Sequence, residues 1–238
     1  PILDLAVSDA YRLLADCQSR RPLSEKTWAS KFGGAPITHE EWKDVYREAS
    51  STELTTKQQE VLYKIVTLKI DTNKRRMQDP QRTWAAPGHA SSGCKKCGAA
   101  IETIEHLFIE CAPAAALWTH VLALFSRYAG ATFAPDTRPL LLGRFARADW
   151  DKVRRTHRGQ TARVWRQLRA LALGAVKSSR NELLFEDRDY DFSTVRARFR
   201  ASLIGLLRRE QLLHARNIDA WTHDDVLARR APDGTIVV

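Results

Sequence analysis

Three of the four cysteines in this sequence share one short segment with a histidine, in the spacing Cys94-x2-Cys97-x8-His106-x4-Cys111. Two thiolates three residues apart on one tight turn can share an ion, and a histidine and cysteine on a following helical turn can close a tetrahedron around it. Soft sulfur with imidazole favours a single zinc ion. Because four protein ligands leave no open position, the spacing predicts a structural zinc site. The alternative is a chance cluster of buried cysteines beside a surface histidine.

The residues around the cysteine pair suit a metal-binding turn. Gly93 and Gly98 flank it, and Gly98 supplies the backbone freedom that such a turn requires. Lys95 and Lys96 are expected to offset part of the negative charge of three thiolates. The remaining cysteine, Cys17, falls in a helical apolar pattern and is expected to be an inert buried thiol.

Apolar residues elsewhere recur at helical spacing, with no sustained alternation of period two and no βαβ pattern. A capping box is predicted at Thr38 and Glu41, and Ser24 is expected to cap the turn that follows it. Pro113 is expected to open a helix. The sequence therefore predicts a mostly α fold, a helical domain with an embedded Cys3His zinc knuckle. The longer helices are predicted over 1–19, 54–77, 149–184 and 193–216.

We expect three regions that together form one compact unit. Residues 1–87 form an N-terminal helical region, 88–130 the zinc knuckle and the helix after it, and 131–238 a C-terminal helical region. Residues 1–19 do not resemble a signal peptide, and no stretch approaches the roughly 18 uncharged apolar residues of a membrane span. The first residue is not methionine, so we expect a piece of a longer intracellular protein that has no membrane partner.

A run of residues around the predicted metal ligands resembles the zinc-binding domain of non-LTR (LINE-type) retrotransposon reverse transcriptases. The run is Glu102-Thr103-x-x-His106-Leu107-Phe108-x-x-Cys111, preceded by Cys94-x-x-Cys97. Weaker similarities extend over about residues 28–190. They include Trp42–Tyr46 upstream, and the helix from Trp165 to Ala175 that leads into Arg180-Asn181 downstream.

The resemblance implies a domain that follows the polymerase of the same polyprotein and helps to bind template RNA or target DNA, in the nucleus and cytoplasm. It implies no polymerase chemistry in this segment, which also has no Tyr-x-Asp-Asp string. The family's metal role falls on Cys94, Cys97, His106 and Cys111. The expected function is therefore non-catalytic nucleic-acid binding, with the upstream polymerase domain as a further partner.

The charge agrees with a polyanionic partner, since 38 basic and 28 acidic residues give a net charge of +10. Basic residues gather before and within the knuckle, and again near residue 155, where Arg163, Arg166 and Arg169 continue the group. A third group, within 196–209, is interpreted as the solvated face of a helix. The candidate phosphate contacts are Lys74, Arg75, Arg76, Arg82, Lys95, Lys96, Arg154, Arg155 and Arg158.

Two alternatives remain. The chain could be a domesticated protein-interaction module with structural zinc, whose charge binds an acidic protein. It could also precede a restriction-like endonuclease, because Pro232-Asp233 lies after the knuckle as in some retroelements of this class. Pro-Asp-Gly is also a common turn, and the sequence has no partner carboxylate or lysine after it.

Overall fold

The computed structural model describes residues 23–32, 37–78, 91–145, 147–153, 158–213, 215–222, 227–232 and 236–237. These residues are mainly helical, which confirms the predicted fold class. The strands found among them are β1 (Arg229–Arg230) and β2 (Ile236–Val237), which form an antiparallel pair. The predicted helix 1–19 and Cys17 lie outside the described residues.

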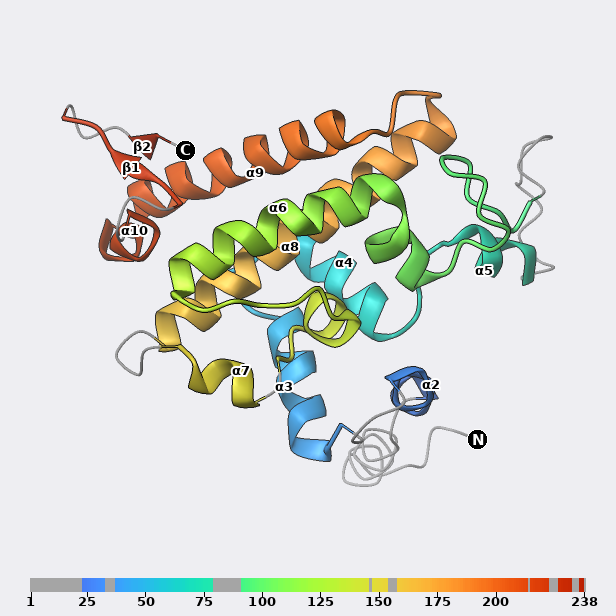
Figure 1. Ribbon diagram of the computed structural model, residues 1–238, viewed down its shortest axis with the longest axis horizontal. Helices are drawn as coiled ribbons and strands as arrows, with labels where there is room; N and C mark the ends of the chain where they lie inside the picture. The colour runs from blue at the N-terminus through green and yellow to red at the C-terminus, as the bar shows by residue number, and fades with distance from the viewer. Residues whose placement is uncertain are drawn as a thin grey trace, which may run out of the picture.

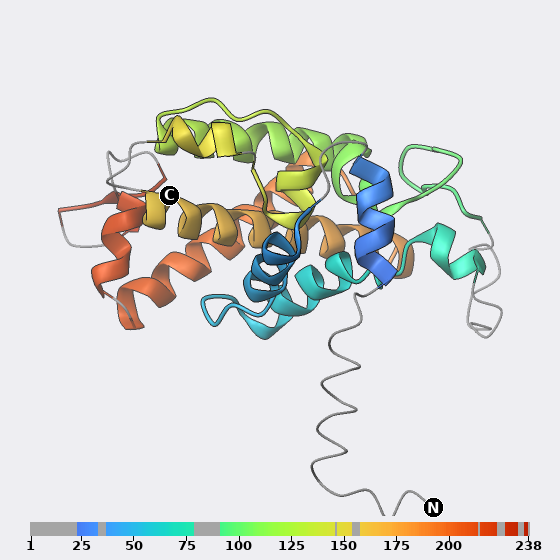
Figure 2. The same cartoon turned by 90° about the horizontal axis from the view of Figure 1, so that it is seen from below.

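Two long helices form the centre of the fold, α8 (Arg158–Phe185) and α9 (Phe192–Leu213). They run side by side, and α6 (Ala112–Ala129) packs against both (Figure 1). On another side of α8 lies α4 (Thr56–Val66), which in turn contacts α3 (His39–Ala49). Figure 2 shows the same helices from below, with α2 (Leu23–Phe32) beside α4.

Local sequence signals explain several helix ends. At Thr38 and Glu41 the predicted capping box is present, since each side chain binds the other's backbone N–H. The helix α6 has Pro113 in its first turn, as predicted, and ends at Gly130 in the left-handed conformation with φ 65°. The predicted helix cap at Ser24 is wrong, because α2 already begins at Leu23 and Ser24 therefore lies inside the helix.

The predicted helix 54–77 is wrong as one element, because the structure has α4 and then a separate α5 (Asn73–Gln78). The chain leaves α4 through a Schellman turn, in which Lys69 N–H donates to Lys64 O at 2.6 Å and Leu68 N–H donates to Ile65 O at 3.0 Å. Leu68 occupies the left-handed position with φ 56°. This position is usually glycine, so no residue in the sequence marked the break.

The predicted helix 149–184 is likewise divided, into α7 (Arg147–Asp151) and α8. The turn after α7 is closed by backbone hydrogen bonds from Lys152 to Asp149 O and from Val153 to Trp150 O. The predicted helix 193–216 also differs at its end, since α9 stops at Leu213 and α10 (Ala215–Thr222) follows.

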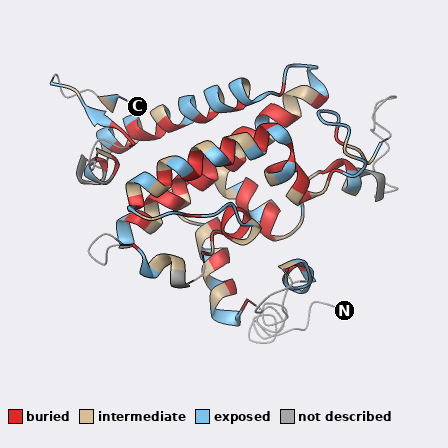
Figure 3. Cartoon of the chain, in the orientation of Figure 1, coloured by how far each residue is buried: buried red, intermediate tan, exposed pale blue. Residues whose placement is uncertain are grey.

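The core lies where α4, α6, α8 and α9 face one another, and Figure 3 shows the buried residues along these faces. Trp118 and Trp165 are both 1% exposed and therefore belong to the core. Trp165 joins an aromatic cluster with Phe125 and Phe145. Trp150 packs edge-on against Phe145, with 5.6 Å between the ring centroids, so its side chain contributes to the aromatic core.

Candidate metal centre

The four predicted metal ligands come together. One ligand atom from each of Cys94, Cys97, His106 and Cys111 lies within 4.8 Å of all the others. The Sγ atoms of Cys94 and Cys111 are 3.8 Å apart, and Cys97 Sγ lies 3.4 Å from His106 Nε2. In a tetrahedral zinc site the ligand bond lengths imply about 3.8 Å between two sulfurs and about 3.6 Å between sulfur and nitrogen. These two distances therefore match a tetrahedral arrangement, and the group could hold one metal ion.

The first two ligands lie on a tight turn. Gly98 N–H donates to Cys94 O at 3.0 Å, and Cys94 N–H donates to Ala99 O at 2.8 Å. Gly98 has φ +73°, which confirms the predicted need for glycine there. A Cβ atom on Gly93 would lie 3.0 Å from Ala99 O, so both glycines keep the turn closed.

The other two ligands flank a π-helical turn, η2 (His106–Glu110). His106 is its first residue, and Cys111 directly follows its last. Its defining bond runs from Cys111 N–H to His106 O at 2.8 Å, and the next residue begins α6. Thr103 Oγ1 accepts from His106 N–H at 3.0 Å at the start of this turn. A π-turn brings residues five positions apart together across its hydrogen bond, which is how the x4 spacing becomes a shared ligand set.

The surroundings shift the pKa values of two of the ligands, Cys94 and Cys111. The contact with the Cys111 thiol holds the pKa of Cys94 well below its usual range. The same contact, together with burial, raises the pKa of Cys111. A divalent cation would remove this conflict by stabilising every thiolate at once. His106 directs Nε2 at the sulfurs, while its Nδ1 lies 3.7 Å from Glu110 Oε2, a carboxylate placed to orient the ring.

A buried polar network, which the sequence did not predict, holds this segment against the helices. Asn73 N–H donates to Glu102 Oε1 at 2.9 Å, and Asn73 Nδ2 donates to Gly93 O at 2.6 Å. Arg180 on α8 donates to both Glu102 and Asn73. The sequence feature that could have indicated this network is Arg180, a charged residue one helical turn after Val176 on the apolar stripe of α8.

Lys95 makes contacts that the sequence did not predict. Its Nζ donates to Asp187 Oδ1 at 2.7 Å and to Leu183 O at 3.1 Å. The side chain therefore ties the metal-binding turn to the end of α8 and to the residues that follow it. Lys96 is exposed beside it.

The candidate phosphate contacts are only partly described. Lys74 is exposed, as are Lys95 and Lys96. Arg75 is half-buried, and its Nη1 donates to Leu68 O at 2.9 Å. The side chains of the other candidates lie outside the described part of the chain: Arg76, Arg82, Arg154, Arg155 and Arg158.

The three arginines that continue the second basic group each pair with an acidic residue of the fold, which the sequence did not predict. Arg163 and Arg166 both pair with Glu53, at 3.2 and 2.6 Å. Arg169 is 2% exposed and pairs with Glu48 at 3.3 Å. These partly or fully buried guanidinium groups of α8 pair with Glu48 of α3 and with Glu53 in the turn after α3, so they are structural.

Comparisons with protein-family models, with curated proteins and with solved structures found no match to this chain. Within the described residues, every helix is too short or too polar to cross a membrane.

Proposed function

We propose that this chain is a zinc-stabilised, non-catalytic domain that binds RNA or DNA as part of a LINE-type reverse transcriptase or a protein derived from one. The observation that carries the proposal is the convergence of Cys94, Cys97, His106 and Cys111, the residues on which the family resemblance rests. An intracellular location, in nucleus and cytoplasm, and an upstream polymerase partner belong to the same proposal.

Zinc is the proposed ion because three sulfurs and one imidazole form its usual structural ligand set. When bound, zinc supplies a closed cross-link with no position for a substrate. The turn at 94–98 would be fixed to the start of α6, and Lys95 extends that connection to the end of α8. The ion would therefore set where the exposed lysines Lys74 and Lys96 stand relative to the helices.

Nucleic acid is the proposed partner because a net charge of +10 attracts a polyanion, and Lys74 and Lys96 present free charge near the metal centre. Neither lysine makes an ion pair with a described residue. This leaves both ammonium groups available to phosphates.

The proposal is tested by metal analysis followed by binding. The purified chain is expected to hold one zinc per molecule, and cobalt substitution should give the absorption bands of a tetrahedral thiolate site. Labelled RNA and DNA should then bind in a salt-dependent manner, measured by fluorescence anisotropy. The double variant Lys74→Ala/Lys96→Ala should bind more weakly, with a log–log salt slope that is shallower by about 1.4 if both lysines contact a single strand.

The matched control is Lys26→Ala, which removes an exposed lysine on α2. It is expected to leave affinity unchanged. A parent chain that binds neither RNA nor DNA at low salt would refute nucleic-acid binding and support the protein-interaction alternative. A chain without zinc would remove the basis of the family resemblance.

A further inference from the structure

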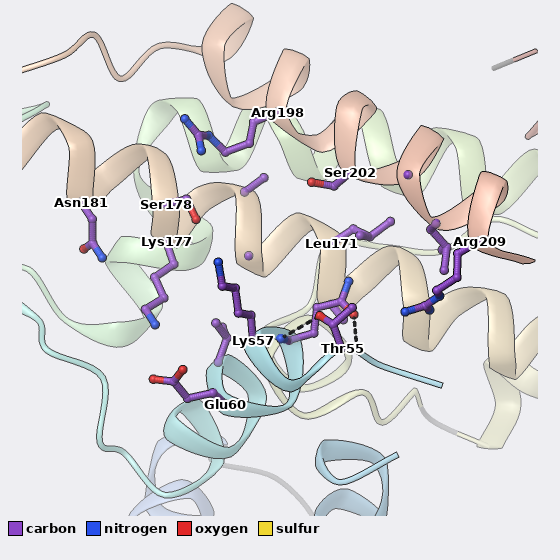
Figure 4. A pocket seen from close by; sticks show the side chains of 17 residues that line it. Thr55, Lys57, Glu60, Leu171, Lys177, Ser178, Asn181, Arg198, Ser202 and Arg209 are labelled. Atoms are coloured by element: carbon purple, nitrogen blue, oxygen red, sulfur yellow. Dashed lines mark hydrogen bonds between the residues drawn. The ribbon is translucent and has the colours of Figure 1, made fainter. Parts of the chain in front are cut away.

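A groove of about 600 Å³ lies between α4, α8 and α9, apart from the metal ligands. Figure 4 shows side chains from all three helices around it, with Lys57 on α4 and Arg209 on α9 reaching into the space and Lys177 on α8 directed toward Glu60. Arg198 adds a fourth cation to the lining, and Glu60 is the acidic residue among the residues that line it. The lining therefore contains four cations and one carboxylate.

The floor of the groove is kept open by two glycines in helix interiors, Gly174 on α8 and Gly205 on α9. A Cβ atom built on either would meet no atom within 4 Å, and neither glycine has a positive φ. Close packing and backbone conformation therefore do not require them. Because glycine destabilises a helix interior relative to alanine, their effect here is to leave the groove unfilled.

The cations of the groove are incompletely neutralised. Lys57 has no ion pair with a described residue. Lys177 is attracted by Glu60 and Asp71 without an ion pair to either, and Glu60 is held by Lys64 at 2.5 Å. Burial lowers the pKa of Lys177, so its charge is poorly solvated where it stands. Arg198 is bound by Glu182, whereas Arg209 donates to the backbone oxygen of Glu53 at 3.1 Å and lies 4.0 Å from the Glu210 carboxylate. An anion entering the groove would complete this charge balance.

An aromatic side chain stands at one end. A second hollow of about 230 Å³ shares Lys177 and Asn181 with the groove and reaches Phe185, the last residue of α8, which is 58% exposed. Cations beside an exposed aromatic ring are the combination that binds single-stranded nucleic acid, through phosphates and stacked bases.

We propose that this groove binds a single strand of RNA or DNA, with phosphates against Lys57, Lys177 and Arg209 and a base on Phe185. The inference rests on the proposed nucleic-acid binding and adds a second location to the lysines near the knuckle. A hollow of this size admits a few nucleotides of one strand, not a double helix.

The test uses Gly205→Glu and its neutral isostere Gly205→Gln, which project the same volume from the same exposed position of α9. Both replace glycine by a better helix former, so thermal unfolding should confirm an intact fold. With labelled twelve-nucleotide oligo-dT and oligo-U, Gly205→Glu should lose about ten-fold more affinity than Gly205→Gln. Lys57→Ala/Lys177→Ala should flatten the salt slope by about 1.4, whereas Arg208→Ala, an exposed neighbour outside the groove lining, should not.

Failure of the groove and failure of the proposed function give different results. If the parent chain binds no nucleic acid, the proposed function is wrong. If the parent binds but all groove variants bind equally well, the groove assignment is wrong while the function stands. Tighter binding of duplex than of single strand, or equal competition by poly-glutamate, would also overturn the single-strand assignment.

Discussion

Glu102 and Arg180 form an ion pair in which both side chains are almost fully buried, at 1% and 3% exposure. Glu102 Oε2 accepts from Arg180 Nε at 3.3 Å, and its other oxygen accepts from Asn73 N–H. The pair joins the segment that carries the metal ligands to α8. Its role is therefore to fix the metal centre against the helical core.

Glu102→Gln should destabilise the fold by about 3 kcal/mol or more, because Arg180 would keep its buried charge without a counter-ion. Urea denaturation gives the free energy of unfolding. Adding Arg180→Gln to this variant should cost much less than Arg180→Gln alone, since the unpaired charge is then removed. Strict additivity of the two substitutions would show that the residues do not act as a pair.

The control for this experiment is Glu186→Gln. Glu186 pairs with Arg188 at 3.0 Å, but both side chains are more than half exposed. Exposed pairs contribute little, so a change below about 0.5 kcal/mol is expected.

Removal of the metal should loosen the knuckle more than the helical core. Zinc at about a thousand times its Kd stabilises a fold by about 4 kcal/mol, which for a chain of this length is about 10 °C in Tm. Calorimetry with and without a chelator measures this shift. Hydrogen exchange should rise over residues 91–111 and stay slow in α8 and α9. Cys97→Ser should match the chelated parent, and an unchanged Tm would exclude a structural role for the ion.

The metal ligands could be predicted because they are close in the sequence and their spacing alone limits the geometry. The helix capped by Thr38 and the helix opened by Pro113 could be predicted for the same reason, since each is specified by adjacent residues. The break after Val66 could not, because Leu68 adopts a conformation that its side chain does not favour. There Val66 O accepts from Trp28 Nε1 at 3.0 Å, a tertiary contact across 38 residues.

The partners of the buried arginines could not be predicted, for a similar reason. Arginines such as Arg169 and Arg180 usually lie at the surface, and their partners Glu48 and Glu102 are 121 and 78 residues away in the sequence. The groove is also invisible in the sequence, because it depends on how α4, α8 and α9 cross. The sequence features that could have indicated the groove are the interior glycines Gly174 and Gly205, which have no evident packing role.

Gly143→Ala should be among the most damaging substitutions of a single glycine. Gly143 has φ +78°, and a Cβ there would lie 2.9 Å from Arg169 Nη2 and closer still to the Glu48 carboxylate. The new methyl group would displace the Glu48–Arg169 pair in addition to straining the backbone, at about 3 kcal/mol or more. Gly130→Ala, at φ +65° with open space around its Cβ, should cost about 1 kcal/mol. Equal losses in urea denaturation would contradict this.

Acid should weaken the start of α9 through Asp191. Its Oδ1 accepts from Thr194 N–H and from Ser193 Oγ, both at 2.8 Å, which lowers the pKa of Asp191 from 3.8 to about 2. Because the folded pKa is depressed, this contribution to stability is complete above the unfolded value of 3.8 and is lost as the pH falls toward 2. Asp191→Asn keeps an accepting oxygen but cannot titrate, so between pH 5 and 2 its urea midpoint should fall less than that of the parent. Carboxyl NMR should place the Asp191 titration near pH 2, and a midpoint near 4 would mean that the carboxylate does not cap α9.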